Sequence, residues 1–474
     1  MAPMKVTKLT LKNFRCYQEL SIQLDGRLTV LVAANGEGKT SILDALRIAF
    51  WPFVSQFDLA RTAYNDAANG IQIDDVRVTV AGEWPQNEKP LGRVDEIARQ
   101  LPCQIVVECQ SGQEQITWSR VREGEAKRSK TLRGDGCIEL EHRAKSLQAT
   151  VRNFNSAFQD LPLFGYYGTG RLWQHKRLVR SKKSVTDKKN QKIRTFAYSD
   201  CLDPASSYRQ FEDWFIGVFK AAREQQISAL EKGGSASLDE TPYYTMIRVI
   251  QRAINTVLKP VGWQDLVYSQ THDESLVLSN RRQGIFKVSQ LSDGIKNMLG
   301  MIADIAYRCA LLNSHLGEFA AEKTEGVVMI DEIEMHLHPA WQQSVVASLE
   351  MAFPNLQFIL TTHSPQVLTT VPSESIWMLE NGQAHMAPPG SKGAESARLL
   401  RRVFGVESRP PEDKNTQLLK KYEQLVYNDE WNTQQALTIR CQLDQIFAGQ
   451  EPKLSELDLY IENRQWELEL EEGQ

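Results

Sequence analysis

"AANGEGKT", residues 33–40, nearly matches the pattern G-x-x-x-x-G-K-[ST] of phosphate-binding loops. Gly38, Lys39 and Thr40 stand in register, whereas Ala33 occupies the position of the first glycine. The preceding run "RLTVLVAA" predicts a buried strand, and the following run "TSILDALRIAF" has apolar residues at helical spacing. Strand, loop and helix therefore come in the order that a phosphate-binding loop requires.

The amides of this loop and two of its side chains carry the expected chemistry. The amides of Gly36, Gly38 and Lys39 are expected to converge on a β-phosphate at the helix N-terminus, where unpaired N–H groups favour an anion. Lys39 adds its ammonium group, and Thr40 adds a hydroxyl ligand for Mg²⁺. Ala33 is tolerable at the strand end if its φ stays negative, so we expect altered loop geometry more than lost binding.

Composition indicates a globular protein of two or three units, because the chain has 474 residues and is 42% hydrophobic. The N-terminal "MAPMKVTKLTLKNFR" lacks an apolar signal core, and no run is long enough to span a bilayer, so we expect a cytoplasmic protein without membrane contact. Seven cysteines without a C-x-x-C pair suggest reduced thiols. The net charge of −4 gives no general attraction to nucleic acid.

"GVVMIDEIEMHLHPAW" contains a short apolar strand that ends in Asp331 and Glu332, the pattern of a Walker B element. Such a strand delivers Asp331 to Mg²⁺, while Glu332 can polarise the water that attacks the γ-phosphorus. "NLQFILTTHSPQVL" predicts a further strand that ends at His363, which can sense the γ-phosphate. The predicted catalytic residues are therefore Glu332 and His363, and the predicted Mg²⁺ ligands are Thr40 and Asp331.

"QLSDGIKNMLGMIADIAYRCALL" predicts a helix with Ser292 at its N-cap position. The segment resembles the L-S-G-G-Q signature motif of ABC-type ATPases, with Asp293 in place of the first glycine. In those ATPases this helix end faces the nucleotide of another subunit. The resemblance thus implies that Ser292 and Gly294 contact ATP across a homodimer or a higher homo-oligomer. Alternatively, Ser292 is only a helix cap.

The N-terminal "VTKLTLKNFRCYQELSIQL" resembles the start of the SMC/RecF-like branch of ABC ATPases, in which an N-F-R segment precedes an N-G-x-G-K-[ST] loop. The resemblance implies that Arg15 lies near the nucleotide and that Asn35, Gly36 and Ser41 contribute to its binding. Members of this branch serve DNA repair, chromosome organisation and phage defence.

"LFGYYGTGRLW", "LSDGIKNM" and "DEIEMHLHP" are similar to segments of an OLD-like group (AAA_15/AAA_21) that includes the PtuA-type ATPases of the Septu antiphage system and of certain retrons. The resemblance spans most of residues 1–405. It implies an α/β ABC-type P-loop NTPase head with a large α+β insertion and a helical C-terminal extension. The expected segments are 1–80 (N-terminal part of the head), 81–285 (insertion with strand-rich and helical parts), 286–390 (C-terminal part of the head) and 391–474 (helical extension).

Three smaller patterns leave alternatives open. Residues 171–194 hold ten Lys or Arg against one acid, which indicates either a solvated loop or sequence-independent binding of DNA or RNA. His336 and His338 form an H-x-H pair, for which a role at the dimer interface is favoured over metal binding. Gln72 is the expected Q-loop glutamine by its order in the chain, and Gln56 is its rival.

The C-terminal part of the chain lacks two nuclease patterns, since no D-x-D pair follows residue 363 and no H-N-H signature is visible. Any cleavage is therefore expected from a partner nuclease of the HNH type, similar to PtuB. The last stretch, "EPKLSELDLYIENRQWELELEEGQ", has eight acids and two bases with apolar residues between them. It is either a solvated acidic tail or a helix that docks a partner.

Two functions compete on this sequence. In the first, the chain is an ATPase that regulates a partner nuclease in antiphage defence. In the second, it is a stand-alone ATPase that binds DNA ends in repair. A third interpretation, ATP binding without hydrolysis, stays open because of Ala33.

Overall fold

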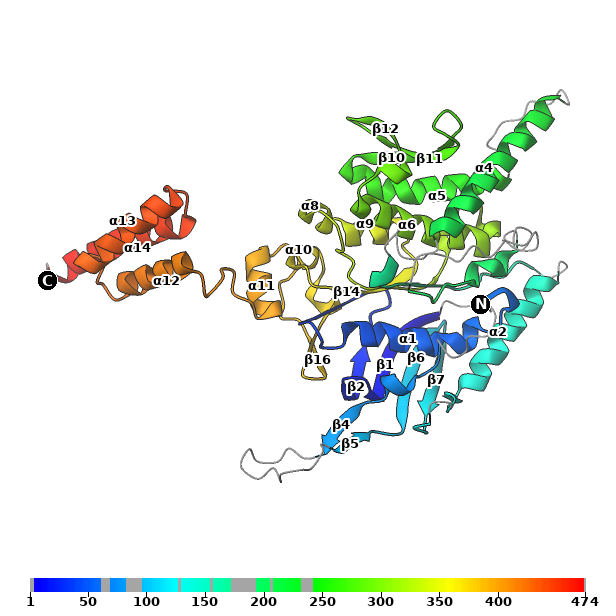
Figure 1. Ribbon diagram of the computed structural model, residues 1–474, viewed down its shortest axis with the longest axis horizontal. Helices are drawn as coiled ribbons and strands as arrows, with labels where there is room; N and C mark the ends of the chain where they lie inside the picture. The colour runs from blue at the N-terminus through cyan, green and yellow to red at the C-terminus, as the bar shows by residue number, and fades with distance from the viewer. Residues whose placement is uncertain are drawn as a thin grey trace. The chain divides into compact units, whose positions relative to one another are not determined.

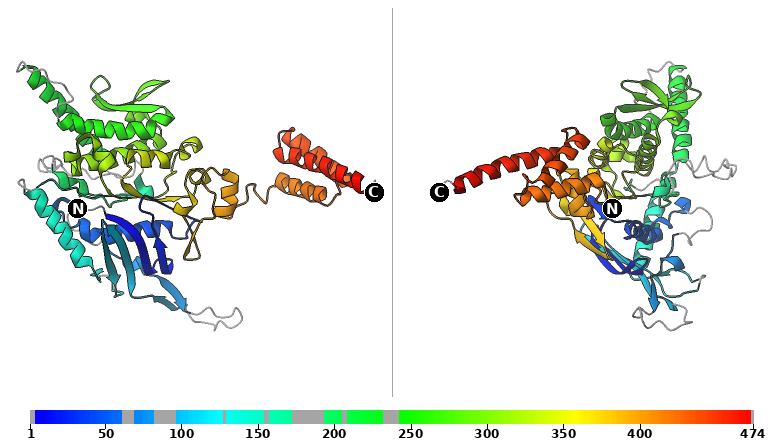
Figure 2. Two further views of the ribbon diagram at one scale, coloured as in Figure 1. Left: turned by 180° about the vertical axis from the view of Figure 1, so that it is seen from behind. Right: turned by 60° about the vertical axis from the view of Figure 1, so that its left-hand side comes forward.

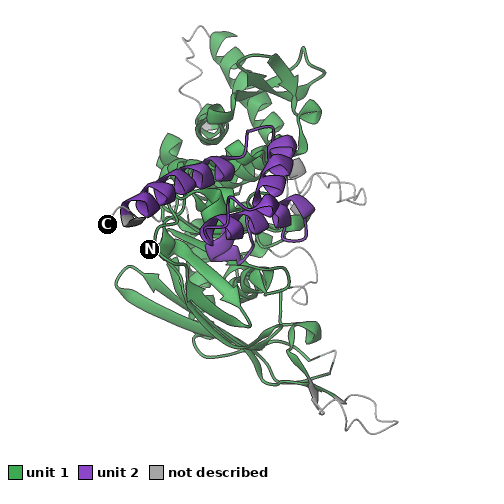
Figure 3. Cartoon of the chain, turned by 90° about the vertical axis from the view of Figure 1, so that its left-hand side faces the viewer, with its two compact units in different colours: residues 1–399 green, residues 400–474 purple. Residues whose placement is uncertain are grey.

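The computed structural model describes eight segments of the chain: residues 4–60, 69–81, 96–126, 129–153, 157–171, 193–204, 208–231 and 242–472. They form two compact units, residues 1–399 and 400–474 (Figure 3). Most of the basic run, residues 172–192, lies outside the described residues. Among the helices that are described, none is both long enough and apolar enough to cross a membrane.

A six-stranded sheet forms the centre of the first unit, in the order β16-β15-β3-β14-β13-β9. Its strands are β3 (Leu28–Ala33), β9 (Leu163–Tyr167), β13 (Gly326–Ile330), β14 (Leu356–Thr362), β15 (Ile376–Glu380) and β16 (Gln383–Met386). All neighbours pair in parallel except β15 and β16. Every residue of β3, β9, β13 and β14 is buried, as expected for parallel strands covered on both faces.

A second, antiparallel sheet has the order β2-β1-β6-β7-β8. Its strands are β1 (Met4–Phe14), β2 (Tyr17–Gln23), β6 (Cys103–Ser111), β7 (Glu114–Arg122) and β8 (Leu132–Arg133). A separate hairpin joins β4 (Val78–Ala81) to β5 (Glu96–Arg99). Figures 1 and 2 show the second sheet below the central one, with α1 (Lys39–Val54) beside it.

The structure differs from the expected division at residue 81. β6 belongs to the predicted insertion, yet it pairs with β1 from Met4↔Ser111 to Lys12↔Gln104. β9 likewise adds an edge strand to the central sheet. The strand-rich part of the predicted insertion is therefore integral to the head, because strand pairing joins segments that lie far apart in the sequence.

Helix α1 packs between the two sheets. From the second sheet, Trp118 Nε1 donates a hydrogen bond of 2.7 Å to the carbonyl of Ala49. From the central sheet, the Phe164 ring lies 4.7 Å from the Phe50 ring, centroid to centroid. α2 (Cys137–Arg152) packs against α1 and β7. These contacts fix the helix that follows the phosphate-binding loop.

A helical layer covers the other side of the central sheet (Figure 1). It comprises α4 (Tyr208–Glu231), α5 (Pro242–Leu258), α6 (Asp293–Leu312), α7 (Ala320–Lys323), α8 (Pro339–Gln342), α9 (Val345–Ala352) and α10 (Pro365–Leu368), with a small sheet of β10 (Trp263–Ser269), β11 (Ser275–Asn280) and β12 (Gly284–Lys287). Nearly all of α6 is buried. Its Asp304 pairs with Arg308 at 2.8 Å and accepts a hydrogen bond of 2.8 Å from Tyr167 Oη, so α6 is tied to the end of β9.

The second unit, residues 400–474, is helical, whereas the helical extension was predicted to begin at residue 391. α11 (Ser396–Phe404) spans this boundary, and α12 (Lys414–Tyr427), α13 (Gln434–Phe447) and α14 (Pro452–Glu472) follow. The unit has its own apolar core, which includes Tyr422, Val426, Trp431, Leu443 and Leu457.

Candidate nucleotide-binding site

The loop between β3 and α1 has the backbone of a phosphate-binding loop. Gly36 and Gly38 adopt φ values of 90° and 89°, a left-handed region that glycine tolerates best. A Cβ atom at Gly38 would collide with Cys16 Sγ and would lie 2.7 Å from Tyr17 Oη, so this position also demands glycine for space. Ala33 ends β3 without a positive φ, which is the condition under which alanine was expected to fit.

Lys39 is held over this loop. Its Nζ atom donates hydrogen bonds to the carbonyls of Ala33 at 2.9 Å and Ala34 at 3.1 Å. Burial lowers the pKa of Lys39, and the nearby carboxylates, of which Asp331 acts most strongly, oppose that shift. An anion would be a stronger partner for this buried cation than two neutral carbonyls, so the loop fits a phosphate group.

Thr40 and Asp331, the two predicted Mg²⁺ ligands, meet in the structure although 291 residues separate them. Thr40 Oγ1 donates to Asp331 Oδ2 at 2.8 Å. Thr361 Oγ1 donates to the other oxygen, Oδ1, at 2.6 Å, and Asp331 is only 2% exposed. A hydroxyl and a carboxylate side by side suit Mg²⁺, which prefers oxygen ligands. The donor set therefore fits this ion.

Glu332 follows β13 directly and has a φ of 48°. Its main-chain N–H donates to Thr361 Oγ1 at 2.8 Å, so a single threonine contacts both acids of the Walker B element. Sequence reasoning did not single out Thr361. The signal was a pair of threonines, Thr361 and Thr362, at the end of β14 after the apolar run Phe358–Leu360.

His363 lies at the end of β14, next to the Walker B loop. Its main-chain N–H donates to Glu334 Oε1 at 2.6 Å. Thr362 Oγ1 donates to Glu334 Oε2 at 2.8 Å. Glu334 thus joins the loop after β13 to the end of β14. This acid was also missed by sequence reasoning.

Arg15 lies in the turn between β1 and β2, and the next two residues, Cys16 of the turn and Tyr17 at the start of β2, lie beside Gly38. The Arg15 side chain donates to Asp44 on α1 and to Asp75, both at 2.8 Å. The structure thus places the turn beside the phosphate-binding loop, with the guanidinium group bound by two carboxylates. A direct role for Arg15 at the nucleotide stays a prediction.

The other residues predicted to bind the nucleotide differ in their exposure to solvent. Asn35 and Gly36 are exposed in the loop, whereas Ser41 is buried in the first turn of α1.

The two candidate Q-loop glutamines bond to main-chain carbonyls near them. The Gln72 side chain donates to the carbonyl of Gly70 at 3.2 Å. Gln56 donates to the carbonyl of Pro52 at 2.9 Å, at the end of α1. The choice between the two glutamines stays a prediction.

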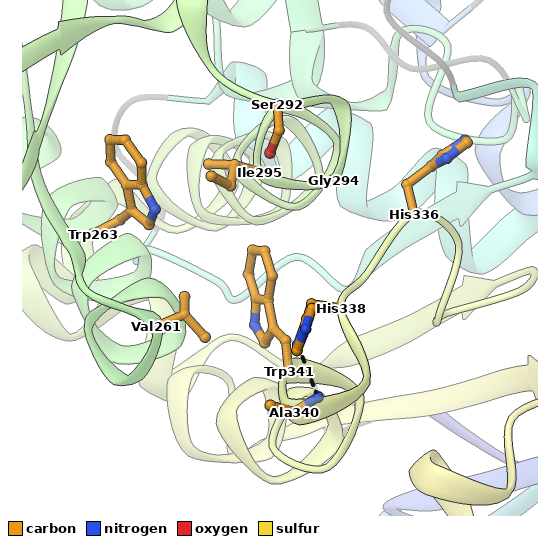
Figure 4. A pocket seen from close by; sticks show the side chains of 9 residues that line it. All are labelled: Val261, Trp263, Ser292, Gly294, Ile295, His336, His338, Ala340 and Trp341. Atoms are coloured by element: carbon orange, nitrogen blue, oxygen red, sulfur yellow. Dashed lines mark hydrogen bonds between the residues drawn. The ribbon is translucent and has the colours of Figure 1, made fainter.

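Ser292 precedes α6 at the N-cap position, but its hydroxyl makes no capping hydrogen bond. Gly294 packs so closely against the loop after β13 that a Cβ atom would overlap the carbonyl of His336. Figure 4 shows the pocket of about 330 Å³ between these elements. It is lined by Val261, Trp263, Ser292, Gly294, Ile295, His336, His338, Ala340 and Trp341.

The two histidines of this pocket take different conformations. His336 has a φ of 63°. His338 caps α8, since its Nδ1 accepts a hydrogen bond of 3.3 Å from the Ala340 N–H. Across the part of the chain that the structure describes, no group of three or more His, Cys, Asp or Glu is arranged to hold a metal ion. His338 therefore acts as a helix cap, and a role of the two histidines at a dimer interface stays a prediction.

A model of a known protein family matches most of the first unit. The family model of the AAA ATPase domain, AAA_15, matches residues 4–368. The chain belongs to this family. Its α/β head, with a P-loop and a Walker B element on parallel strands of one sheet, is therefore the head of an ATPase, as predicted.

Relatives of this ATPase include two retron proteins and a Septu protein. The Retron Vc95 probable ATPase of Vibrio cholerae is 25% identical over 90% of this chain and 84% of its own length. The Retron Ec83 probable ATPase of Escherichia coli is 46% identical over 40% of this chain, which spans about a third (34%) of that relative's length. The Septu protein PtuA of Bacillus mycoides is 35% identical over 32% of this chain and 21% of its own length.

Among solved structures, the SMC head domain from Thermotoga maritima is similar to this chain, with a TM-score of 0.40 and 15% identity. The similarity covers 82% of this chain and 100% of that domain.

Proposed function

We propose that this ATPase regulates a partner nuclease of the HNH type in bacterial antiphage defence. The match to the Vc95 retron ATPase supports this, because it extends over 90% of the chain and so includes more than the ATPase head. The sequence itself contributes the second support, since it has no H-N-H signature of its own.

The proposed site binds ATP with Mg²⁺. The loop amides and Lys39 would hold the phosphates, and Thr40 and Asp331 would hold Mg²⁺, which supplies positive charge near the phosphate oxygens when bound. Glu332 stands directly after β13, where it would orient and deprotonate the attacking water. His363 would contact the γ-phosphate from the end of the adjacent strand. The observation that carries this proposal is the contact of Thr40 with Asp331.

Two copies would share each site. Ser292 is exposed at the start of α6 and makes no capping hydrogen bond, so its hydroxyl can serve a ligand outside its own helix. In the proposed homodimer, Ser292 and Gly294 of one copy face the nucleotide bound by the other. Closure of the heads, controlled by ATP, would then set the activity of the nuclease.

The test is a cleavage assay with the full chain and the product of a neighbouring gene that carries an H-N-H signature. We expect ATP to change the cleavage rate with the wild-type chain and to have no effect with Lys39→Ala. If ATP changes the cleavage rate neither with the wild-type chain nor with Lys39→Ala, the proposed regulation of the nuclease is wrong. Hydrolysis by the isolated chain that duplex DNA stimulates, without any effect of the nuclease, would favour the stand-alone repair function instead.

A further inference from the structure

Helix α14 has two apolar faces, one of which packs against the core of the second unit. Leu454 and Leu457 are buried in the core of the second unit, and Ile461 and Leu468 pack against that core. These four residues repeat at intervals of three, four and seven, so they occupy one side of the helix. This side holds α14 against α12 and α13.

The other face carries an exposed apolar stripe, formed by Leu459, Trp466 and Leu470. Their exposed fractions are 59%, 65% and 54%. Trp466 follows Leu459 by seven residues and Leu470 follows Trp466 by four, so at about 100° per residue the three side chains lie on one line along the helix. Large exposed apolar side chains that align on one face of a helix are a feature of interaction sites.

Acidic residues border the stripe on both sides. By the same helical geometry, Glu462 and Glu469 lie along one border, and Glu456 and Glu467 lie along the other. The second pair is partly neutralised, because Lys453 bonds to Glu456 at 2.9 Å and Arg464 bonds to Glu467 at 3.0 Å. Within the described residues, Glu462 and Glu469 have no such cation. The first border therefore presents the stronger negative charge.

The remainder of α14 is fixed in place by ion pairs. Arg440 of α13 bonds to Asp458 at 2.9 Å, and Arg464 bonds to Asp429 at 3.2 Å. Both pairs form on the side that faces the core of the unit. The stripe is consequently presented on an ordered helix, and a partner would lose little entropy in ordering it on binding.

We propose that this stripe docks a protein partner whose surface has an apolar groove with a basic rim. An amphipathic helix laid in such a groove contributes its apolar anchors to affinity and its charges to orientation and association rate. A second copy of α14 is a poor occupant, because the acidic borders of two stripes would repel each other. This inference rests on the proposed function, since the partner it assigns to the stripe is the HNH-type nuclease.

The test measures the affinity of the full-length chain for that nuclease by titration calorimetry. We expect Trp466→Ala to weaken binding by roughly tenfold or more, because an exposed tryptophan in the centre of an interface is a common hot spot. Glu462→Lys combined with Glu469→Lys should weaken binding further and reduce its salt dependence. Leu437→Ser is the matched control, because Leu437 is also 54% exposed but lies on α13. ATP hydrolysis should be unchanged in all three variants.

Three other results would overturn the proposal. If the nuclease binds Trp466→Ala as tightly as the wild type, the docking surface is wrong while nuclease regulation survives. If the nuclease does not bind the wild type, both proposals fail. If Trp466→Ala abolishes self-association of the chain and leaves its affinity for the nuclease unchanged, the occupant is a second copy of the chain.

Discussion

The main-chain N–H of His363 donates a hydrogen bond of 2.6 Å to Glu334 Oε1. Because Glu334 Oε2 also accepts from Thr362 Oγ1, one carboxylate fixes the backbone at the end of β14. Glu334 lies two residues beyond Glu332, so it connects the two predicted catalytic residues. It would act through His363, as a positioning residue.

We expect Glu334→Ala to reduce kcat for ATP hydrolysis roughly tenfold with little change in KM, because a lost hydrogen bond to a charged group is worth about 1.5 to 3 kcal/mol. Glu334→Gln keeps one acceptor oxygen and should recover part of the rate. Glu350→Gln is the control, since that acid on α9 pairs only distantly, at 3.6 Å, with Arg27. A parallel rise in KM would mean that Glu334 supports nucleotide binding instead.

Lys39→Ala should abolish ATP binding, because it removes the buried cation from the phosphate-binding loop and leaves the amides alone to hold the phosphates. Titration calorimetry with ATP and Mg²⁺ measures this directly. Lys12→Ala, at an exposed position of β1, serves as the control. Equal affinity of Lys39→Ala and the wild type would exclude this loop as the phosphate site.

Glu332→Gln should retain ATP binding and lose hydrolysis, because the amide keeps the shape of the side chain but cannot take a proton. General bases contribute about 10² to 10⁴ in rate, so kcat should fall by at least about 100-fold. Single-turnover assays with prebound ATP separate the chemical step from product release. Unchanged turnover would place the base elsewhere.

Gly38→Ala should weaken ATP binding more than Gly36→Ala. Both positions have positive φ, so both substitutions strain the backbone. Only Gly38 faces Cys16 and Tyr17, whereas a Cβ at Gly36 meets no described atom within 4 Å. The difference in ATP affinity between the two variants therefore reports the packing of the β1–β2 turn on the loop, and equal losses would assign the whole effect to strain.

Ser292→Arg should leave ATP binding by each copy normal while abolishing hydrolysis and protection against phage. A bulky cation at the start of α6 would block closure of two heads, yet it leaves the chain's own phosphate-binding loop intact. Calorimetry, an ATPase assay and a phage plating assay measure the three properties. A variant that hydrolyses and protects like the wild type would rule out shared sites.

The sequence predicted those parts of the site that depend on local pattern. Strands β3, β13 and β14 read as short apolar runs because both of their faces are covered, and the polar residues after them mark the edge where ligands bind. The meeting of Thr40 with Asp331 followed from that logic.

The rest depended on contacts between distant segments. Nothing in "QIVVECQ" shows that β6 pairs with β1, and so the boundary expected at residue 81 divided one sheet. The roles of Thr361 and Glu334 could not be predicted either, because they also depend on contacts between distant segments. Each has a role only because β14 lies beside β13, and a lone threonine or glutamate near a strand end is ordinary.

The close approach of Gly294 to His336 has a mechanical consequence. With no side chain between them, the start of α6 and the loop after β13 contact each other backbone to backbone. A displacement of that loop during turnover must therefore shift α6 as well, and in the proposed pair α6 faces the nucleotide of the neighbouring copy. The two sites would then hydrolyse ATP cooperatively. The methyl group of Gly294→Ala would disturb this contact and reduce the cooperativity.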